Sequence, residues 1–145
     1  MLGPASLAYL HVGDFRPAGL DTVDVVPGEP TDLARLLASV TADDADECGL
    51  ADITSRAFVV RWGNQVVAAA GYRRWPGLVA HLCVLTAPNH RGRGLARAVA
   101  SVAAADGVAN HLLPQWRARP EPSRRVARAL GFRQLGAQMS IRIGT

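Results

Sequence analysis

One junction in the sequence reads Thr86-Ala87-Pro88-Asn89-His90-Arg91-Gly92-Arg93-Gly94-Leu95-Ala96. An apolar, β-branched stretch precedes this junction and apolar residues at helical spacing follow it, so the pattern predicts a strand, a loop and a helix. Gly92 and Gly94 carry no side chain, which lets the backbone approach a ligand closely. The unpaired N–H groups of the first helical turn, with two neighbouring arginines, favour an anion such as a pyrophosphate. The glycine spacing fits neither the dinucleotide fingerprint nor the P-loop.

The segment before the junction predicts an antiparallel meander. Residues 57–62 and 65–72 are apolar and are separated by Gly63-Asn64, which is a two-residue hairpin signal. Pro76-Gly77 marks a second turn and leads into a strand at about 78–86. Three consecutive antiparallel strands therefore reach the junction.

Helices and strands alternate in the rest of the chain. After the junction we expect a helix over 93–106, a strand over 111–117, a helix beginning at Ser123 and a last strand over 134–143. Before the meander we expect a helix near 32–40 capped by Thr31 and a short acidic helix ending near Asp52. This order predicts an α/β fold, with a mixed, mostly antiparallel twisted sheet and helices on both faces.

Length and composition indicate a single globular domain. The chain has 145 residues, of which 49% are hydrophobic, and we expect one domain over 1–145 with a poorly assigned segment at 1–28. No apolar run approaches the roughly 20 residues of a membrane span, and no signal-peptide pattern opens the sequence, so a cytoplasmic location is expected. Cys48 and Cys83 have no metal-ligand spacing, so we expect two free thiols and no metal.

Charge is divided between the two halves of the chain. Residues 1–55 contain two arginines and ten acidic residues, a formal charge of −8, whereas residues 56–145 contain fourteen arginines and two acidic residues, a formal charge of +12. A basic half suits a polyanionic ligand and an acidic half suits a cation. Unrelated solvated faces of opposite sign would give the same count, so charge alone leaves both interpretations open.

The junction resembles the signature of the GNAT superfamily of acyl-coenzyme A N-acyltransferases, which reads Gln/Arg-x-x-Gly-x-Gly/Ala at the start of a helix. Arg91, Gly94 and Ala96 occupy the signature positions. The upstream spacing of Val84, Thr86 and Pro88, and the Gly131-Phe132 pair after a short helix, also match family habits, as does the order of elements from about residue 30 to 143.

The resemblance implies a binding site for acetyl-coenzyme A as the acyl donor. Backbone groups of the strand end would hold the pantetheine arm, the loop and first helical turn would hold the pyrophosphate, and the strand at 111–117 would splay away to admit the thioester. The cofactor-binding residues implied are Val84, Leu85, Thr86, Arg91, Gly92, Arg93, Gly94, Leu95 and Ala96.

The sequence departs from the family at the general acid. Many relatives place a tyrosine about five residues before the terminal phenylalanine, but Ala127 stands at that position here. Ser123 is the nearest hydroxyl that matches, although capping the last helix is the simpler role for a serine there.

The general base is also unsettled. Leu82 and Ala80 share the strand face of Val84 and cannot take a proton, whereas His81 falls on the opposite face, where a structural histidine is the commoner case. The acidic run from Asp43 to Glu47 lies where the acceptor groove of the family usually runs. We therefore expect Glu47→Gln to lower kcat and Asp43→Asn, at most, to raise KM. The catalytic candidates are Glu47, His81 and Ser123.

The function indicated is direct transfer of an acetyl group from acetyl-coenzyme A to a primary amine of a cationic small molecule or peptide, with no membrane partner. A catalytically inactive coenzyme A sensor of the same fold is the alternative. A basic nucleic-acid-binding protein ranks below both, because the chain lacks the interleaved aromatics of single-strand binders. Pairing as a homodimer is compatible with the resemblance.

Overall fold

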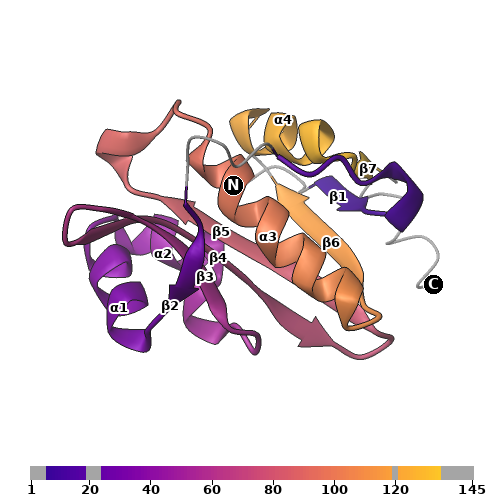
Figure 1. The fold of residues 1–145 in the computed structure, drawn as a ribbon, viewed down its shortest axis with the longest axis horizontal. Coiled ribbons are helices and arrows are strands. Elements are labelled where there is room, and N and C mark those ends of the chain that lie inside the picture. The colour runs from indigo at the N-terminus through magenta and orange to yellow at the C-terminus, as the bar shows by residue number, and fades with distance from the viewer. Residues whose placement is uncertain (1–5, 19–23, 119–120, 135–145) are drawn as a thin grey trace.

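The computed structural model describes residues 6–18, 24–118 and 121–134, and within them seven strands form one sheet (Figure 1). The strand order is β2-β3-β4-β5-β6-β1-β7. The strands are β1 (Ser6–Tyr9), β2 (Val26–Gly28), β3 (Ala57–Trp62), β4 (Gln65–Trp75), β5 (Val79–Thr86), β6 (Leu113–Ala118) and β7 (Arg133–Gln134). The helices are α1 (Pro30–Ala38), α2 (Ala42–Cys48), α3 (Leu95–Ala109) and α4 (Glu121–Leu130), with 3₁₀ turns η1 (Val12–Asp14), η2 (Leu50–Asp52) and η3 (Pro88–His90).

The expected meander is confirmed in strands β3, β4 and β5. Each of these strands pairs antiparallel with the next, and Gly63 adopts a φ of 63° in the first turn. The chain then crosses through α3, and β6 returns parallel to β5. The mixed sheet and its helices confirm the fold class predicted from the sequence.

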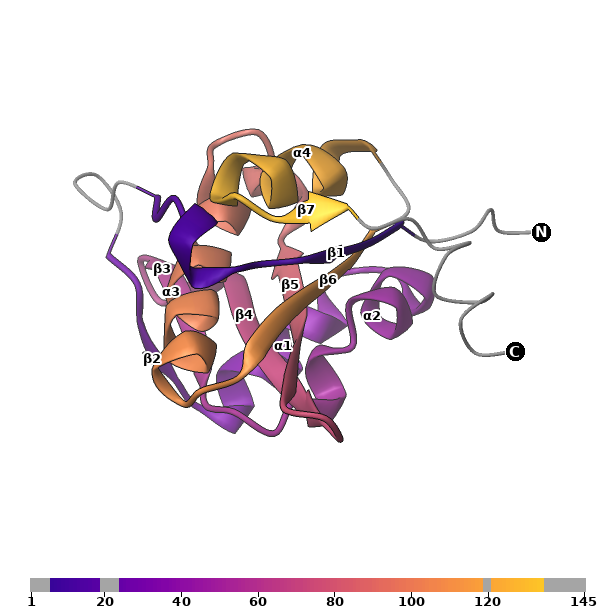
Figure 2. The ribbon, with the colours of Figure 1, turned by 90° about the vertical axis from the view of Figure 1, so that its right-hand side faces the viewer.

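Helices cover both faces of the sheet (Figure 2). One core lies between the sheet and the pair α3 and α4, where Tyr72, Val99 and Leu130 are buried together. The other core lies on the opposite face, where Leu36 of α1 and Leu50 of η2 pack against Val59. No helix within the described ranges is long and apolar enough to cross a bilayer.

Small residues bring α3 close to the sheet. Ala100, Ala103 and Ala104 of this helix are fully buried, and a Cβ atom added to Gly107 would lie 3.2 Å from the Cβ of Ala80. A close helix fixes the position of its own N-terminus relative to β5. The loop between β5 and α3 is therefore held by rigid elements on both sides.

Two expected helix caps are wrong. Helix α1 begins one residue earlier than Thr31, because Glu29 is the N-cap, Pro30 is the first helical residue and Asp32 completes a capping box. Helix α4 begins at Glu121, so Ser123 lies inside its first turn and is not the cap.

The first strand joins the sheet far from its neighbours in sequence. Strand β1 lies between β6 and β7 and runs antiparallel to both, with Tyr9 opposite Gln115 in β6 and Arg133 in β7. Of the last strand expected over 134–143, the structure describes only β7, Arg133–Gln134, and the remainder lies outside the described residues. The segment that follows β1 is tied to α4, because the backbone N–H of Arg16 donates to the carbonyl oxygen of Leu130 at 2.9 Å.

Candidate active site

A cavity of about 930 Å³ opens where β5 and β6 separate. The described pairs between these parallel strands end at His81 and Gln115, although β5 continues to Thr86. Residues 82–86 pair with β4 on one edge, and on the other edge they have no described strand beside them. These residues line the cavity. This is the splay that the resemblance implied.

The glycine loop forms one end of the cavity. Gly92 and Gly94 adopt φ angles of 80° and 76°, and a Cβ atom added at either position would meet no atom of the described residues within 4 Å, apart from its chain neighbours. The first described helical bond of α3 runs from the N–H of Ala98 to the carbonyl of Gly94, so the N–H groups before Ala98 remain for a ligand. The open space and the helix N-terminus fit a phosphate group.

Two buried polar atoms at this end have no partner in the described part of the chain. They are Oγ1 of Thr86 and Nδ1 of His90, and both residues line the cavity. Because a buried polar atom without a partner is costly, a ligand that supplies hydrogen bonds here would stabilise the folded protein. These atoms and the loop geometry fit the phosphate and pantetheine parts of coenzyme A.

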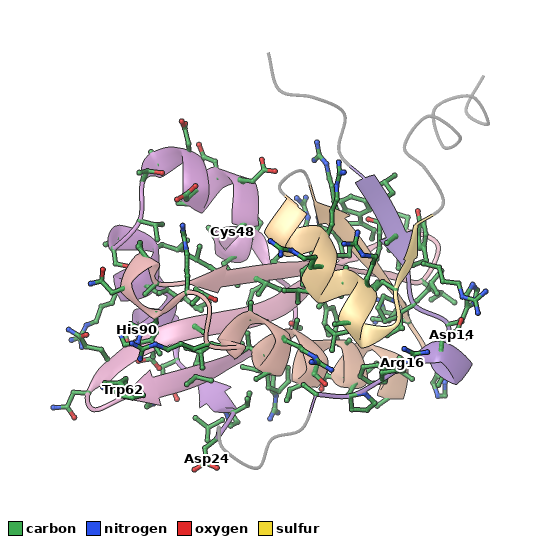
Figure 3. The ribbon with its side chains drawn as sticks, turned by 90° about the horizontal axis from the view of Figure 1, so that it is seen from above. Asp14, Arg16, Asp24, Cys48, Trp62 and His90 are labelled. Atoms are coloured by element: carbon green, nitrogen blue, oxygen red, sulfur yellow. The ribbon has the colours of Figure 1, made fainter. Side chains whose placement is uncertain are left out.

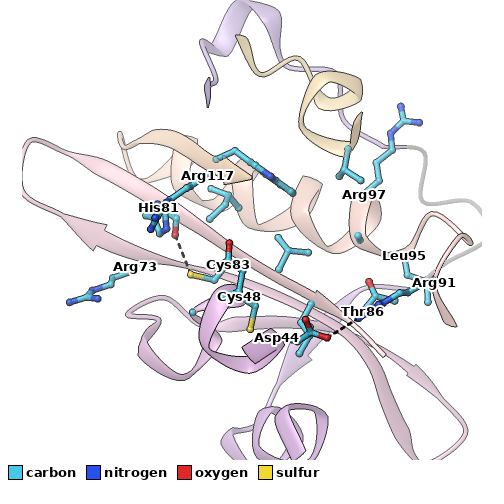
Figure 4. Close-up of a pocket in the computed structure, with 18 of the residues that line it drawn as sticks. Asp44, Cys48, Arg73, His81, Cys83, Thr86, Arg91, Leu95, Arg97 and Arg117 are labelled. Atoms are coloured by element: carbon cyan, nitrogen blue, oxygen red, sulfur yellow. Dashed lines mark hydrogen bonds and ion pairs between the residues drawn. The ribbon is translucent and has the colours of Figure 1, made fainter. Parts of the chain in front are cut away.

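The loop is anchored on its outer side by the tip of the β3–β4 hairpin (Figure 3). The ring centroids of Trp62 and His90 lie 5.7 Å apart, and the guanidinium of Arg93 lies 5.6 Å from the centroid of the Trp62 ring. These contacts turn the guanidinium of Arg93 toward Trp62 and away from the glycines. Arg91 faces the other way and pairs with Asp44 of α2 at 3.5 Å (Figure 4).

The cavity walls carry opposite charges from the two halves of the sequence. The acidic lining residues come from α2 and η2, and the basic lining residues come from the strands, the loop and the helices after it. The acidic residues are Asp44, Asp46, Glu47 and Asp52, and the basic residues are Arg73, Arg91, Arg97, Arg117 and Arg125. Asp43 does not line the cavity.

His81 lies at the closed end of the splay. Its Nδ1 is 2.8 Å from Oε1 of Gln115, and its ring stacks on Trp75 with centroids 4.3 Å apart and planes 6° apart. Burial lowers the pKa of His81 below its usual value, and the guanidiniums of Arg117 and Arg73 lower it further against the opposing hydrogen bond from Gln115. These effects favour the neutral imidazole, which is the form able to accept a proton.

The nine residues expected to bind the cofactor fall on β5, the loop and the start of α3. Eight of them line the cavity, namely Val84, Leu85, Thr86, Arg91, Gly92, Gly94, Leu95 and Ala96. The ninth, Arg93, is turned toward Trp62. Glu47 and His81 line the same cavity. The side chain of Ser123 is outside the described part of the structure.

Two aromatic residues near the splay differ in position. Tyr72 faces α3, where its hydroxyl donates to Oδ2 of Asp106 at 2.6 Å, so it does not line the cavity. Trp116 lines the cavity and also packs edge-on against Phe132, with centroids 5.6 Å apart. It therefore serves as both a wall residue and a core residue.

Several residues of the site were missed in the sequence. Gln115 is an uncharged polar residue between the apolar residues Pro114 and Trp116, and it is 4% exposed, which is consistent with a buried hydrogen-bonding role. Tyr9, Trp75 and Arg73 had no such signal, because each reaches the site only through strand pairing.

Comparison with known proteins agrees with this geometry. A family model described as GNAT acetyltransferase matches residues 51–137. No curated protein matches the chain. Similar folds include a GNAT-family acetyltransferase structure from Novosphingobium aromaticivorans, with a TM-score of 0.70, 22% identity and coverage of 94% of this chain and 62% of that one.

Two further solved structures are similar in fold. A GNAT-family acetyltransferase from Colwellia psychrerythraea has a TM-score of 0.68 and 16% identity, and the match covers 93% of this chain and 54% of that one. A GCN5-related N-acetyltransferase from Kribbella flavida has a TM-score of 0.68 and 20% identity, and the match covers 92% of this chain and 55% of that one. The chain thus spans between 54% and 62% of the length of these three structures.

Proposed function

Because the chain belongs to the GNAT acetyltransferase family, we propose that it transfers the acetyl group of acetyl-coenzyme A to a primary amine. One observation carries this proposal. A single cavity joins a glycine loop, where Thr86 and His90 present buried polar atoms without partners, to a neutral imidazole at His81. The first end suits a phosphate-bearing donor, and the second suits the removal of a proton from an attacking amine.

The donor would lie along the free edge of β5. Backbone groups of residues 82–86 on that edge have no neighbouring strand, so they are available to the amides of the pantetheine arm. Arg97 and Arg125 line the cavity and are the arginines we propose for the 3′-phosphate. Arg91 would exchange its exposed pairing with Asp44 for the pyrophosphate, at small cost because exposed ion pairs contribute little.

The transfer would be direct. The protonated amine first gives one proton to His81, and its neutral nitrogen then attacks the thioester carbon. A C–N bond forms, the C–S bond breaks, and the nitrogen gives up its second proton to solvent. The thiolate leaves and takes a proton from solvent, because Ala127 stands where relatives carry a tyrosine. Burial raises the pKa of the Cys83 thiol to about 12, so the nearest cavity cysteine is protonated and unsuited to forming an acyl-enzyme.

The acidic wall supports a cationic acceptor. Asp46, Glu47 and Asp52 line the same cavity as the arginines, and carboxylates there would attract a protonated amine toward the splay. In this arrangement His81 of β5 takes the proton. The carboxylates of α2 raise the local concentration of the acceptor. The acceptor class proposed is a small-molecule or peptide amine.

The test is release of free thiol from acetyl-coenzyme A in the presence of a mixed panel of amines, with a no-amine control. We expect thiol release that depends on at least one amine and a product heavier by one acetyl group. Binding of acetyl-coenzyme A without thiol release from any amine would support the coenzyme A sensor instead, which the absence of the tyrosine at Ala127 favours. Absence of both binding and release would overturn the proposal.

A further inference from the structure

We propose that Gln115 and Tyr9 are positioning residues for His81, which hold its imidazole proton on Nδ1 and leave Nε2 as the proton acceptor in the cavity. This inference deepens the proposed function and rests on it. It concerns neither the glycine loop nor α2. It depends on three side chains that lie in one row across three strands.

The row is fixed by strand register. His81 of β5 pairs with Gln115 of β6, and Gln115 pairs with Tyr9 of β1. Directly paired residues point to the same face of a sheet, so the three side chains lie side by side. The face is the one that carries Arg73, away from α3.

Two hydrogen bonds run along the row. Nδ1 of His81 is 2.8 Å from Oε1 of Gln115, and Nε2 of Gln115 donates to the hydroxyl of Tyr9 at 2.8 Å. Because an amide oxygen only accepts, Nδ1 must be the nitrogen that carries the proton. Since a neutral imidazole has one proton on its two ring nitrogens, Nε2 then carries the free lone pair.

The middle of the row is buried and its outer end is open. Gln115 is 4% exposed, so its amide has little access to water and depends on these two partners. No hydrogen bond to Nε2 of His81 is present among the described residues, and this side chain lines the cavity. The lone pair is therefore available to a ligand.

The ring plane is fixed by a separate contact. Trp75 stacks on His81 at 4.3 Å with an angle of 6° between planes, which prevents the imidazole from turning about its Cβ bond. The same indole face would stabilise the imidazolium formed when Nε2 accepts a proton. Gln115 would retain its hydrogen bond from Nδ1 throughout, so proton uptake requires no rearrangement of the row.

The charged groups around His81 keep it neutral until an amine arrives. Arg73 on β4 and Arg117 on β6 flank it, and the neutral thiol of Cys83 lies two residues along β5. The carboxylates of α2 and η2 line the same cavity. Burial and the two guanidiniums hold the pKa of His81 below its usual value.

The first test uses nitrogen-15 NMR of the histidine ring in the protein without ligand. We expect His81 of the wild type to show a protonated Nδ1 and an unprotonated Nε2 near pH 7.5. Gln115→Met keeps the side-chain length but removes both hydrogen bonds, so the tautomer should become mixed. Gln115→Glu should keep the proton on Nδ1 and raise the pKa of His81, because a carboxylate favours the imidazolium.

A proton found on Nε2 in the wild type would overturn the inference. That result would mean that the amide of Gln115 is reversed and donates to Nδ1. An unchanged tautomer in Gln115→Met would overturn it as well, because the row would then not control the ring.

The second test measures the pH dependence of amine acetylation. Tyr9→Phe and Gln115→Met should lower kcat by about 10-fold or more, with KM for acetyl-coenzyme A within about 2-fold of wild type. Gln115→Glu should retain most of kcat and move the acid limb of the pH profile to higher pH. Wild-type kcat and pH profiles in all three variants would overturn the inference.

Ser101→Ala is the matched control, because Ser101 and Gln115 are the two buried polar residues of the described chain. The hydroxyl of Ser101 accepts from the N–H of Ala18 at 3.0 Å. Ser101 belongs to α3, whereas His81 lies on the sheet face away from that helix. This variant should lose stability without any change in the pH profile.

Failure of the proposed function would be seen separately. Acetyl-coenzyme A binding, measured by calorimetry, should be the same in the wild type and the row variants, because no row residue belongs to the loop. A wild type that binds no acetyl-coenzyme A would overturn the function, while the NMR test would still decide whether the row sets the tautomer.

Discussion

Gly94 shows how one residue can serve both the backbone and a ligand. It is the N-cap of α3, adopts a φ of 76°, and leaves open space where a side chain would stand. A β-branched residue there would be strained and would also fill the space that a phosphate needs. These two effects can be separated by comparison with another glycine.

Replacement of Gly94 by valine should weaken acetyl-coenzyme A binding by about 100-fold or more, which corresponds to roughly 2.7 kcal/mol. Gly77→Val is the matched control, because Gly77 has a φ of 86° and open space around it but lies in the β4–β5 turn. Both variants should lose similar stability, and Gly94→Val alone should lose affinity in a calorimetric titration. Equal affinity in the two variants would mean that the loop is not the phosphate site.

Tyr72 gives a prediction for alkaline pH. Burial and the hydrogen bond to Asp106 raise the pKa of Tyr72 to about 12, from 10.0 for an ordinary tyrosine. The folded state favours the neutral phenol, so this stabilisation is complete below about pH 10 and is lost as the pH rises toward 12. Urea denaturation at several pH values should show this loss in the wild type.

Tyr72→Phe provides the comparison. It should be less stable than the wild type by about 1 kcal/mol at pH 8, and the difference should shrink as the pH rises from 10 to 12. A constant difference over that range would show that the phenol of Tyr72 does not titrate on unfolding.

Residues differ in how far the sequence could identify them. Arg91 and Gly94 lie in one contiguous motif, and their roles follow from local spacing. Tyr9, His81 and Gln115 form an equally specific arrangement, but 106 residues separate Tyr9 from Gln115 and 34 separate His81 from Gln115. Local patterns carry no information about such pairs, and period-two counting says only on which face of the strand His81 lies.

At the scale of elements, α2 and the segment after β1 have roles that periodicity could not assign. The short acidic helix was predicted, and the structure places three of its carboxylates on a cavity wall. The segment around η1 was not assigned, because its structure depends on contact with the end of α4 rather than on its own pattern. The meander and α3, which have strong local patterns, were predicted closely.

The cavity wall formed by α2 gives a prediction about the acceptor. With His81 as the base, Glu47→Gln should raise KM for a cationic amine several-fold and leave kcat within about 2-fold. Asp43→Asn is the control, because Asp43 is on the same helix but does not line the cavity, and it should change neither constant. A fall in kcat of about 100-fold in Glu47→Gln would assign the base to α2, as the sequence alone suggested.

The junction of α4 with the segment after β1 gives a prediction about stability. Gly131 has a φ of 102°, and a Cβ atom there would overlap the carbonyl oxygen of Asp14. Gly131→Ala should therefore lower the free energy of unfolding by about 2 kcal/mol or more. In Gly13→Ala, where a Cβ atom meets nothing within 4 Å, the change should stay within about 0.5 kcal/mol.

For the whole molecule, the acidic part and the basic part of the sequence both contribute residues to one cavity. Every acidic residue that lines the cavity belongs to the first 52 residues, and every arginine that lines it comes from position 73 onward. The sequence count suggested an anionic ligand and a cationic one, and the fold places both attractions on one site. The count alone could not exclude unrelated surfaces, because it holds no information on which faces meet.

A ligand that binds only the folded state should raise the melting temperature of the whole domain. At 100 times its dissociation constant, acetyl-coenzyme A should add about 2.7 kcal/mol, or roughly 5–10 °C for a chain of this size. Differential scanning fluorimetry would measure the shift. Dephospho-coenzyme A should give a smaller shift at equal concentration if Arg97 and Arg125 bind the 3′-phosphate, and no shift with either ligand would contradict the assignment of the cavity.

Because β1 lies between β6 and β7, it can pair with its neighbours only after those later strands have been synthesised. At about 5–20 residues per second, Tyr9 leaves the peptidyl-transferase centre roughly 5–20 s before Gln115 is added. During that interval β1 has neither of its partner strands, while the β3–β5 meander can already pair. The strand that orients the proposed base is thus made before its two partner strands and can take its place only after them, so a nascent chain can form its glycine loop before it has a complete site.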